Sequence, residues 1–369
     1  MISGEYGPTF DICLRAEARL PGARRVVLDN YEAEGWSDVA ADCGAELATA
    51  MTGFLQGRAA EEPRGPRDGS HAGLTYHIEG SGPALLLLPF FLAPSQWAPV
   101  VPELARHFSL VTVGGRHLGG VAMLEDRARA PSYRAMFRAL TDLMHPRPGE
   151  AILDVGSGAG SLDRQLAGRL GEANPITGCD ANGFLLREAE ALAREDGVAD
   201  RIRFVPGNAE NLPFADASFG CVFSVTVIEE CDADRAIAEM VRVARPGGRI
   251  GVIVRAIDLP QWWSLDLPDD LRRKVTPPPQ SVAARGVADK SLYRRMARAG
   301  LQDLTCLPFL VTLDRPDGPI WRYREDHVLS LLTPDELALW HGARDKATAD
   351  GPLLASHAMH CAVGTKPAG

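Results

Sequence analysis

Short apolar runs that end in an acidic residue or a glycine recur along the middle of the chain. The clearest covers residues 152–155, where Asp154 is the one polar position, and it leads into Gly156, Gly158 and Gly160. A helical pattern over residues 161–170 follows directly. This order predicts a buried parallel strand, a tight glycine turn and the N-terminus of a helix.

Further strands are predicted downstream at similar intervals. Residues 176–180 form a second apolar run that ends in Asp180, and residues 203–210 read as a third strand and its loop. Residues 218–224 predict a fourth strand, and residues 241–250 close a helix, turn at two glycines and open a fifth strand. Strands that alternate with helices in this way predict an α/β fold with a parallel sheet.

The polar residues at the strand ends suggest a nucleoside ligand. Glycines remove Cβ atoms, so that a ligand can lie against bare backbone with amide N–H groups available to it. The carboxylate of Asp180 can accept both hydroxyls of a ribose. Asn208 can accept from an adenine amino group, and the Ala209 N–H can donate to a ring nitrogen. Dinucleotide-binding loops share this physics, but their third glycine follows the second by three residues instead of two.

Four stretches in this order resemble the class I S-adenosylmethionine-dependent methyltransferases, especially the branch similar to quinone-biosynthesis enzymes. They read ILDVGSGAGSL, GCDANGFLLREAEALA, VPGNAENLPFADASFGCVFS and RVARPGGRIGV. The resemblance covers about residues 131–255, with a weaker match as far as Lys366. It implies a Rossmann-like doubly wound sheet of seven mostly parallel strands, with the final strand antiparallel, and S-adenosylmethionine as the cofactor.

The resemblance also assigns roles to residues of this chain. The methionine end of the cofactor is expected near Ser224 and the glycine loop, and Asp180 is expected to hold the ribose. The cofactor-binding set is therefore Asp154, Gly156, Ser157, Gly158, Gly160, Asp180, Ala181, Asn208, Ala209 and Ser224. Two departures stand out: Asn208 replaces the aspartate that is usual in the family, and Glu229 and Glu230 stand where many relatives carry histidine.

The methyl acceptor is expected beyond the fourth and fifth strands, where ligands of doubly wound sheets bind. Glu229 or Glu230 could act as a general base; alternatively one caps the next helix or orients the cofactor while the other is solvated. Adjacent residues point in different directions, so at most one should face the acceptor. Tyr133, on the segment that enters the domain, is a candidate substrate-binding residue.

Aromatic residues after the fifth strand are further candidates. Trp262 and Trp263 lie in an insertion over about residues 258–290 that is rich in proline, which suits a lid. They line the acceptor pocket or pack in a core or dimer interface. An amphipathic cluster could meet an anionic acceptor or form an ordinary surface segment; it comprises Trp321, Arg322, Tyr323 and Arg324.

The first third of the chain predicts a separate small α/β module. Residues 58–73 are a polar connector rich in proline and glycine, and strands at 74–79, 84–88 and 109–113 with a helix at 100–106 follow it. The segment resembles the opening of an α/β-hydrolase, but no G-x-S-x-G nucleophile motif occurs in the chain. We therefore expect a degenerate module for dimerisation or active-site cover over residues 1–130, followed by the methyltransferase domain over residues 131–369.

Composition fits a globular enzyme. The 369 residues are 46% hydrophobic and 24% charged, and the formal net charge of -9 disfavours broad nucleic-acid or anionic-membrane binding. We find neither a leader pattern nor a run of about 20 apolar residues. The seven scattered cysteines favour a reducing cytosol. His357 and His360 are three apart on a predicted strand and so face opposite ways, which argues against a shared metal ion.

The sequence therefore predicts a cytoplasmic, homodimeric methyltransferase that transfers a methyl group from S-adenosylmethionine to a small molecule by in-line displacement. An NAD(P)-dependent oxidoreductase and a non-catalytic S-adenosylmethionine-binding scaffold remain as alternatives. A methyltransferase for protein or nucleic acid is disfavoured by the acidity of the chain. The acceptor and its attacking atom stay open, because one fold hosts many chemistries.

Overall fold

The computed structural model describes residues 1–6, 8–32, 39–57, 60–71, 74–88 and 97–368. They divide into two compact units, Met1–Val121 and Ala122–Gly369, and each is described by itself. Helix α5 (Gly119–Arg129) runs across this division. The domain boundary expected after residue 130 stays a prediction.

The first unit contains the strands expected after the polar connector. Its four-stranded sheet has the order β3-β4-β6-β5, in which β4 pairs antiparallel and β5 pairs parallel with β6. A separate parallel pair is formed by β1 and β2. The strands are β1 (Ile2–Tyr6), β2 (Val26–Glu32), β3 (Asp68–His71), β4 (Leu74–Gly80), β5 (Ala84–Leu87) and β6 (Ser109–Gly114); the helices are α1 (Pro8–Arg19), α2 (Val39–Asp42), α3 (Gly44–Leu55) and α4 (Val101–Leu104). The likeness of this unit to a hydrolase stays a prediction.

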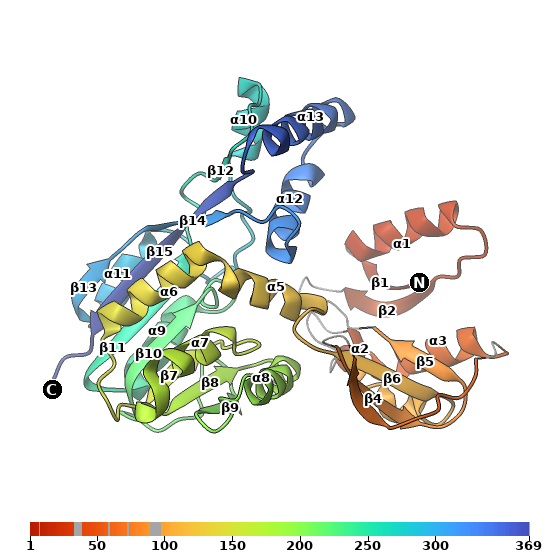
Figure 1. Ribbon diagram of the computed structural model, residues 1–369, viewed down its shortest axis with the longest axis horizontal. Coiled ribbons are helices and arrows are strands. Elements are labelled where there is room, and N and C mark those ends of the chain that lie inside the picture. The colour runs from red at the N-terminus through yellow and green to blue at the C-terminus, as the bar shows by residue number, and fades with distance from the viewer. Residues whose placement is uncertain (7, 33–38, 58–59, 72–73, 89–96, 369) are drawn as a thin grey trace. The chain divides into compact units, whose positions relative to one another are not determined.

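The second unit is built on a mixed, mostly parallel sheet with the Rossmann-like arrangement that we expected (Figure 1). Five parallel strands run in the order β9-β8-β7-β10-β11, so the chain starts in the middle and moves outwards in both directions. The last strand pairs antiparallel with β11, as predicted. The strands are β7 (Ile152–Val155), β8 (Ile176–Asp180), β9 (Ile202–Pro206), β10 (Phe219–Val225), β11 (Ala244–Arg255) and β15 (Ala355–Thr365).

The sheet contains nine strands instead of the expected seven. The final strand β15 is 11 residues long and extends past the end of β11, where β12 (Trp262–Trp263) pairs with its first two residues. Its other edge pairs with β13 (Gln302–Cys306) and then with β14 (Phe309–Leu313). Pro308 has no N–H to donate and separates these two strands. The expected sixth strand is thus replaced by several short segments.

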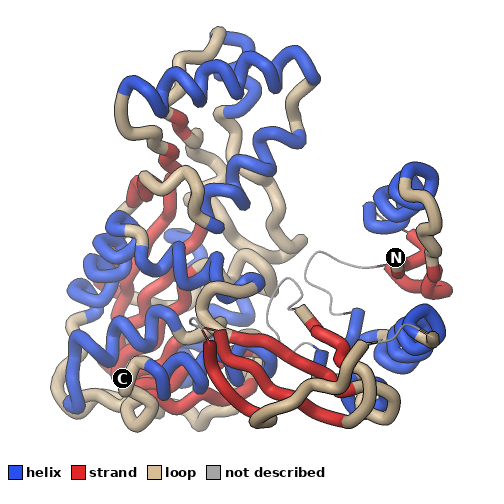
Figure 2. The backbone as a smooth tube through the Cα atoms, turned by 45° about the vertical axis from the view of Figure 1, so that its right-hand side comes forward, coloured by secondary structure: helices blue, strands red, loops and turns tan. Residues whose placement is uncertain are grey.

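Helices cover both faces of this sheet, as Figure 2 shows. Helix α6 (Pro131–Met144) lays Phe137 against Phe223 of β10, with ring centroids 5.5 Å apart, and shares its core with α7 (Ser161–Leu170) and α8 (Gly183–Glu195). The opposite core contains α9 (Ala233–Val243) and α11 (Ser291–Arg298). Within the described part of the chain, none of the helices is both long and apolar enough to span a bilayer.

A helical layer lies beyond the end of the sheet where β12 and β14 pair with β15. It contains α10 (Asp269–Val275), α12 (Pro319–Ser330) and α13 (Pro334–Asp350). Trp263 stands edge-on to Trp321 at 5.4 Å and to Trp340 at 5.2 Å, so tryptophans from three elements hold the layer together. The layer therefore draws on residues 319–350 as well as on the insertion that we expected at about 258–290.

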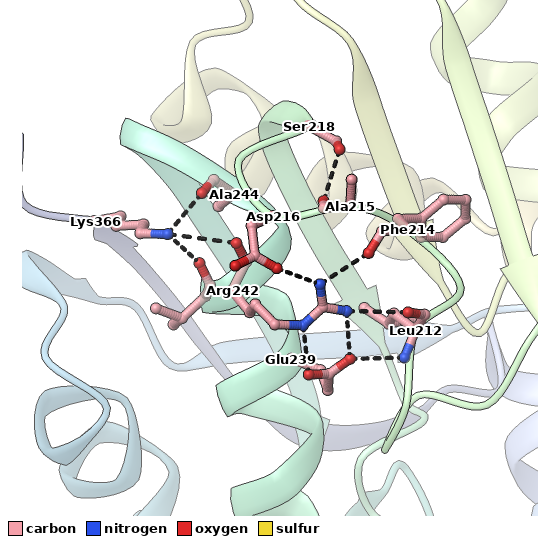
Figure 3. Close-up of polar contacts among 10 residues, drawn as sticks. Leu212, Phe214, Ala215, Asp216, Ser218, Glu239, Arg242, Ala244 and Lys366 are labelled. Atoms are coloured by element: carbon pink, nitrogen blue, oxygen red, sulfur yellow. Dashed lines mark hydrogen bonds and ion pairs between the residues drawn. The ribbon is translucent and has the colours of Figure 1, made fainter.

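One arginine fixes the loop that follows β9. Figure 3 shows Arg242 of α9 clamped to Glu239 by two bonds of 2.7 Å, while it also donates to the backbone oxygens of Leu212 and Phe214 at 3.0 and 2.8 Å. Asp216 accepts a further bond of 2.7 Å. This hydrogen bonding lowers the pKa of Glu239. A planar fork with five donors suits this arrangement, and a lysine does not.

We expect Arg242→Lys to lower the free energy of unfolding by about 1–3 kcal/mol, because several charge-assisted bonds are lost together while the charge is kept. Urea denaturation measures the effect. Arg245→Lys, at an exposed position just after the same helix, is the matched control and should be neutral. Equal stability of the two variants would contradict the clamp.

Candidate functional site

The glycine turn after β7 is held in a conformation that only glycine adopts easily. Gly156 has φ +83°, and a Cβ there would overlap the Val227 side chain. The amides of Gly156 and Ser157 donate to Cys179 O at 2.7 and 3.1 Å, which pins the turn to β8. Gly160, with φ +69°, begins α7. The bare backbone therefore faces the carboxyl edge of the sheet, where parallel α/β sheets bind ligands.

Asp180 closes this turn from the end of β8. One of its oxygens accepts from Gly158 N and the other from Asn182 N, both at 2.8 Å. Burial raises the pKa of Asp180, against the lowering effect of these two bonds. Each carboxylate oxygen has two lone pairs, so the side chain can still accept two ligand hydroxyls. Ala181, the next residue, is exposed.

Two more carboxyls are buried beneath the turn without donors. Asp154 is 2% exposed and Asp163 is fully buried, and Asp154 Oδ1 and both Asp163 oxygens have no hydrogen-bond partner in the part of the chain that is described. Burial raises the pKa of Asp154 well above its ordinary value, and the charges of Asp163 and Asp180 raise it further. Burial likewise raises the pKa of Asp163 to about 7, although Arg164 opposes the rise. Such carboxyls suit a ligand that brings a cation.

Arg127 of α5 lies at the same edge. Its Nη1 donates to Thr226 Oγ1 at 3.0 Å, and its Cζ lies 5.9 Å from the centroid of the Tyr133 ring. Its charge lowers the pKa of Asp154. Thr226 follows β10 with φ +58°, a conformation that threonine adopts only under strain, and strain of this kind concentrates at functional sites. Among the described residues, no carboxylate pairs with Arg127.

The loop after β9 presents the residues expected to contact adenine. Asn208 is exposed, and its Oδ1 accepts from Glu210 N at 2.8 Å, which forms a compact turn. Ala209 is half-buried beside it. Ser224 points elsewhere: it is fully buried, and its Oγ donates to Val155 O at 2.8 Å, tying β10 to β7. Its hydroxyl serves the sheet.

The two expected bases have different environments. Glu229 is 1% exposed and grips Arg255, accepting from the backbone N and, at 2.5 Å, from Nε. Both of its oxygens are occupied, so it positions Arg255. Glu230 is 44% exposed in its side chain and lies 3.5 Å from Arg255, and burial raises its pKa. Of the pair, Glu230 is the carboxylate with room to accept a proton.

The three expected substrate-binding residues also lie in different environments. Tyr133 is 6% exposed, and its hydroxyl lies 2.8 Å from His357 Nε2. Trp263 packs in the tryptophan cluster, whereas Trp262 is 52% exposed. His360 points the opposite way from His357 and contacts Tyr293 and Asp258, so the two histidines cannot share an ion. Only Tyr133 reaches the edge that carries Arg127.

Sequence reasoning missed two members of this site. Asp163 sits on the inward stripe of α7, three and four residues before Leu166 and Ala167, where a charged residue breaks the apolar pattern. That break was the available signal. Arg127 gives no such sequence signal, since it looks like an ordinary arginine in the last turn of a helix.

The second unit has a Rossmann-like α/β fold. Residues 153–252 match the family described as "Methyltransferase domain". The matched segment runs from β7 into β11.

The chain is similar to curated C-methyltransferases over this same region. It is 36% identical over 117 residues to the ubiquinone/menaquinone biosynthesis C-methyltransferase UbiE of Legionella pneumophila strain Paris, covering 31% of this chain and 47% of that protein. The UbiE of Vibrio cholerae strain Ogawa 395 is 33% identical over 132 residues, covering 36% of this chain and 51% of that protein. The chain spans about half the length of these relatives.

Among solved structures, the YcgJ protein of Bacillus subtilis aligns with 64% of this chain and 100% of its own, at a TM-score of 0.45 and 20% identity. A putative methyltransferase of Bacillus halodurans aligns with 63% of this chain and 99% of its own, at a TM-score of 0.43 and 18% sequence identity.

We expect Gly156→Ala to destabilise the protein by about 1–2 kcal/mol or more, because alanine strains the left-handed backbone and meets Val227. Thermal unfolding measures the change.

Gly168→Ala is the matched control. Gly168 lies inside α7 with open space around its Cα, so alanine there should be neutral or stabilising by about 0.5–1 kcal/mol. A Gly156→Ala variant as stable as this control would show that the turn is not strained.

Proposed function

We propose that this chain binds S-adenosylmethionine at the carboxyl edge of its second unit and transfers the methyl group to a small-molecule acceptor. The observation that carries the proposal is a pair of buried carboxyls under the glycine turn, in which Asp154 Oδ1 and both oxygens of Asp163 have no hydrogen-bond partner among the described residues. The cofactor bears an ammonium group and supplies an electrophilic methyl on a sulfonium. A positive ligand compensates these carboxylates, so the residues fit the group.

The remaining residues divide the cofactor among them. Asp180 accepts the ribose hydroxyls beside the Gly158 amide. Arg127, whose guanidinium has spare donors, pairs with the amino-acid carboxylate. Asn208 and Ala209 contact the adenine edge from the loop that Arg242 holds. Ser157, Ala181 and Ser224 shape this cradle through their backbones or their packing.

The same carboxyls argue against the dinucleotide alternative. A pyrophosphate over the turn would keep Asp154 and Asp163 protonated and could not pair with their charged forms, whereas an ammonium group can. The glycine spacing points the same way. The scaffold alternative differs from an enzyme by turnover alone, so formation of S-adenosylhomocysteine together with a methylated product from an added acceptor decides between them.

The catalytic step depends mainly on positioning, because the leaving group is already good. An acceptor beyond β10 and β11 approaches the methyl group in line, opposite the sulfur. Glu230 takes a proton where the acceptor must lose one, and Glu229 keeps Arg255 in place. The homodimeric state, the cytoplasmic location and a lid role for the segment at about 258–290 belong to this proposal as well.

Isothermal titration tests the cofactor assignment. The wild-type chain should bind S-adenosylmethionine and S-adenosylhomocysteine, and NAD+ at least about tenfold more weakly. Asp180→Ala should lose at least about tenfold of the affinity for both adenosyl ligands, since two hydroxyls lose their acceptor.

Asp200→Ala, an exposed carboxyl in the turn after α8, is the control and should bind like the wild type. An unchanged affinity in Asp180→Ala would overturn the assignment.

Affinity should also depend on pH through Asp163. Its pKa is raised to about 7 in the empty site, so below that pH the carboxyl must release a proton before it can pair with the ligand ammonium. We expect S-adenosylhomocysteine to bind more tightly as the pH rises from about 5.5 to about 7.5, by up to about tenfold per unit.

Asp163→Asn should make this dependence shallower, because asparagine does not titrate. Asp154 still titrates in that variant, so a residual slope is expected. A wild-type affinity independent of pH, or a variant that keeps the full slope, would contradict the role of Asp163.

A further inference from the structure

An arginine of α12 is buried without an acceptor. Arg324 is 8% exposed, its Nε is fully buried without a partner, and it forms no ion pair or hydrogen bond within the described part of the chain. Its neighbour Glu325 accepts from Trp321, Trp340 and Arg344 at 2.9, 3.0 and 3.0 Å. A satisfied carboxylate thus stands next to an unsatisfied guanidinium, and such a cation is costly to bury.

This guanidinium belongs to the acceptor side of the site. Strand β11 ends opposite Met359, so His357 lies past its carboxyl end, on the face that meets Tyr133 of α6. Asp126, the residue before Arg127, accepts from Ile320 N at 3.3 Å, and Ile320 lies one helical turn ahead of Arg324. Helix α12 is therefore docked where α5 carries Arg127.

The electrostatics agree with this placement. Burial lowers the pKa of His357 well below its ordinary value, and the charges of Arg324, Arg127 and Arg255 lower it further, in that order. The charges of three guanidiniums thus act on the same imidazole. Arg255 is occupied by Glu229 and by Ser281 O at 2.5 Å, and Arg127 is assigned above to the cofactor. Arg324 is the guanidinium that remains for the acceptor.

We propose that Arg324 binds an anionic group, a carboxylate or a phosphate, of the methyl acceptor. The inference rests on the proposed function and names the substrate class of that site. His357 adds a second donor: when the Tyr133 hydroxyl donates to Nε2, the ring proton sits on Nδ1, which is buried without a partner. A planar guanidinium beside an N–H forms an oxyanion-binding corner.

Small aromatic probes test the proposal on the full chain saturated with S-adenosylhomocysteine. The anionic probes are phenyl phosphate and 4-hydroxybenzoate, and the neutral ones are phenol and 4-hydroxybenzamide. We expect at least one anion to bind in isothermal titration, and its neutral counterpart to bind at least about tenfold more weakly. The anion that binds shows whether the site prefers a phosphate or a carboxylate.

Variants assign the binding to Arg324. Arg324→Gln should lose at least about tenfold of the affinity for the anion, Arg324→Lys should lose less, and Arg322→Gln, exposed on the same helix, should lose none. All three should keep the wild-type affinity for S-adenosylhomocysteine. Arg324→Met should raise the melting temperature of the ligand-free protein, because an unpaired buried charge is removed; a structural arginine would give the opposite sign.

The outcomes separate the two proposals. A wild-type chain that binds no S-adenosylhomocysteine overturns the proposed function itself. A chain that binds it, but binds neither anion or binds one equally well in Arg324→Gln, overturns only the role of Arg324. A loss of S-adenosylhomocysteine affinity in Arg324→Gln also overturns it, since the arginine then serves the cofactor.

Discussion

The energetic constraint behind this site is the burial of two carboxyls that nearby arginines compensate only in part. Asp154 ends the first strand of the sheet and Asp163 lies on the inner stripe of the next helix, so the fold itself forces both into the interior. Each is far easier to keep protonated than charged there, and their raised pKa values express that cost. A cationic ligand removes the cost and gains affinity from it. The empty site is therefore destabilised in a way that binding can relieve.

At the carboxyl edge of the sheet, acidic and basic groups lie over different strands. Acidic groups gather over β7 and β8, at Asp154 and Asp180, while Arg127 and Arg255 lie toward β10 and β11. Beyond them, Arg324 and His357 lie near the part of β15 that extends past the end of β11. Under the proposed function, the ammonium and the carboxylate of the donor's amino-acid end would meet a carboxylate and a guanidinium. The change from acidic to basic groups would then lead from the donor toward the proposed acceptor.

The sequence predicted what depends on local patterns. The strands, the glycine turn and Asp180 could be predicted from the sequence, because apolar runs and glycines mark them within a few residues. The antiparallel last strand came from the resemblance. The strand count was wrong, because the pairing of β12, β13 and β14 with one long strand is set by tertiary contacts between residues far apart in the sequence. Sequence pattern also left open which residues of the 321–324 cluster face inward; in the structure they are Trp321 and Arg324.

Whether a buried polar group has hydrogen-bond partners distinguishes the structural residues of this unit from its candidate site residues better than charge alone does. Arg164 is as deeply buried as Arg324, yet it binds Ala159 O and Asp196 and pairs with Glu125. Glu229 has the residue type of a base, but both of its oxygens are occupied by Arg255. A group whose bonds are complete can only lose by meeting a ligand, whereas a buried group without partners gains from it. Among the described residues, the buried atoms of this edge without a partner include Asp154 Oδ1, both Asp163 oxygens, Ser157 Oγ, Arg324 Nε and His357 Nδ1. The acids and the donors among them are what the proposed positively charged donor and negatively charged acceptor would complete.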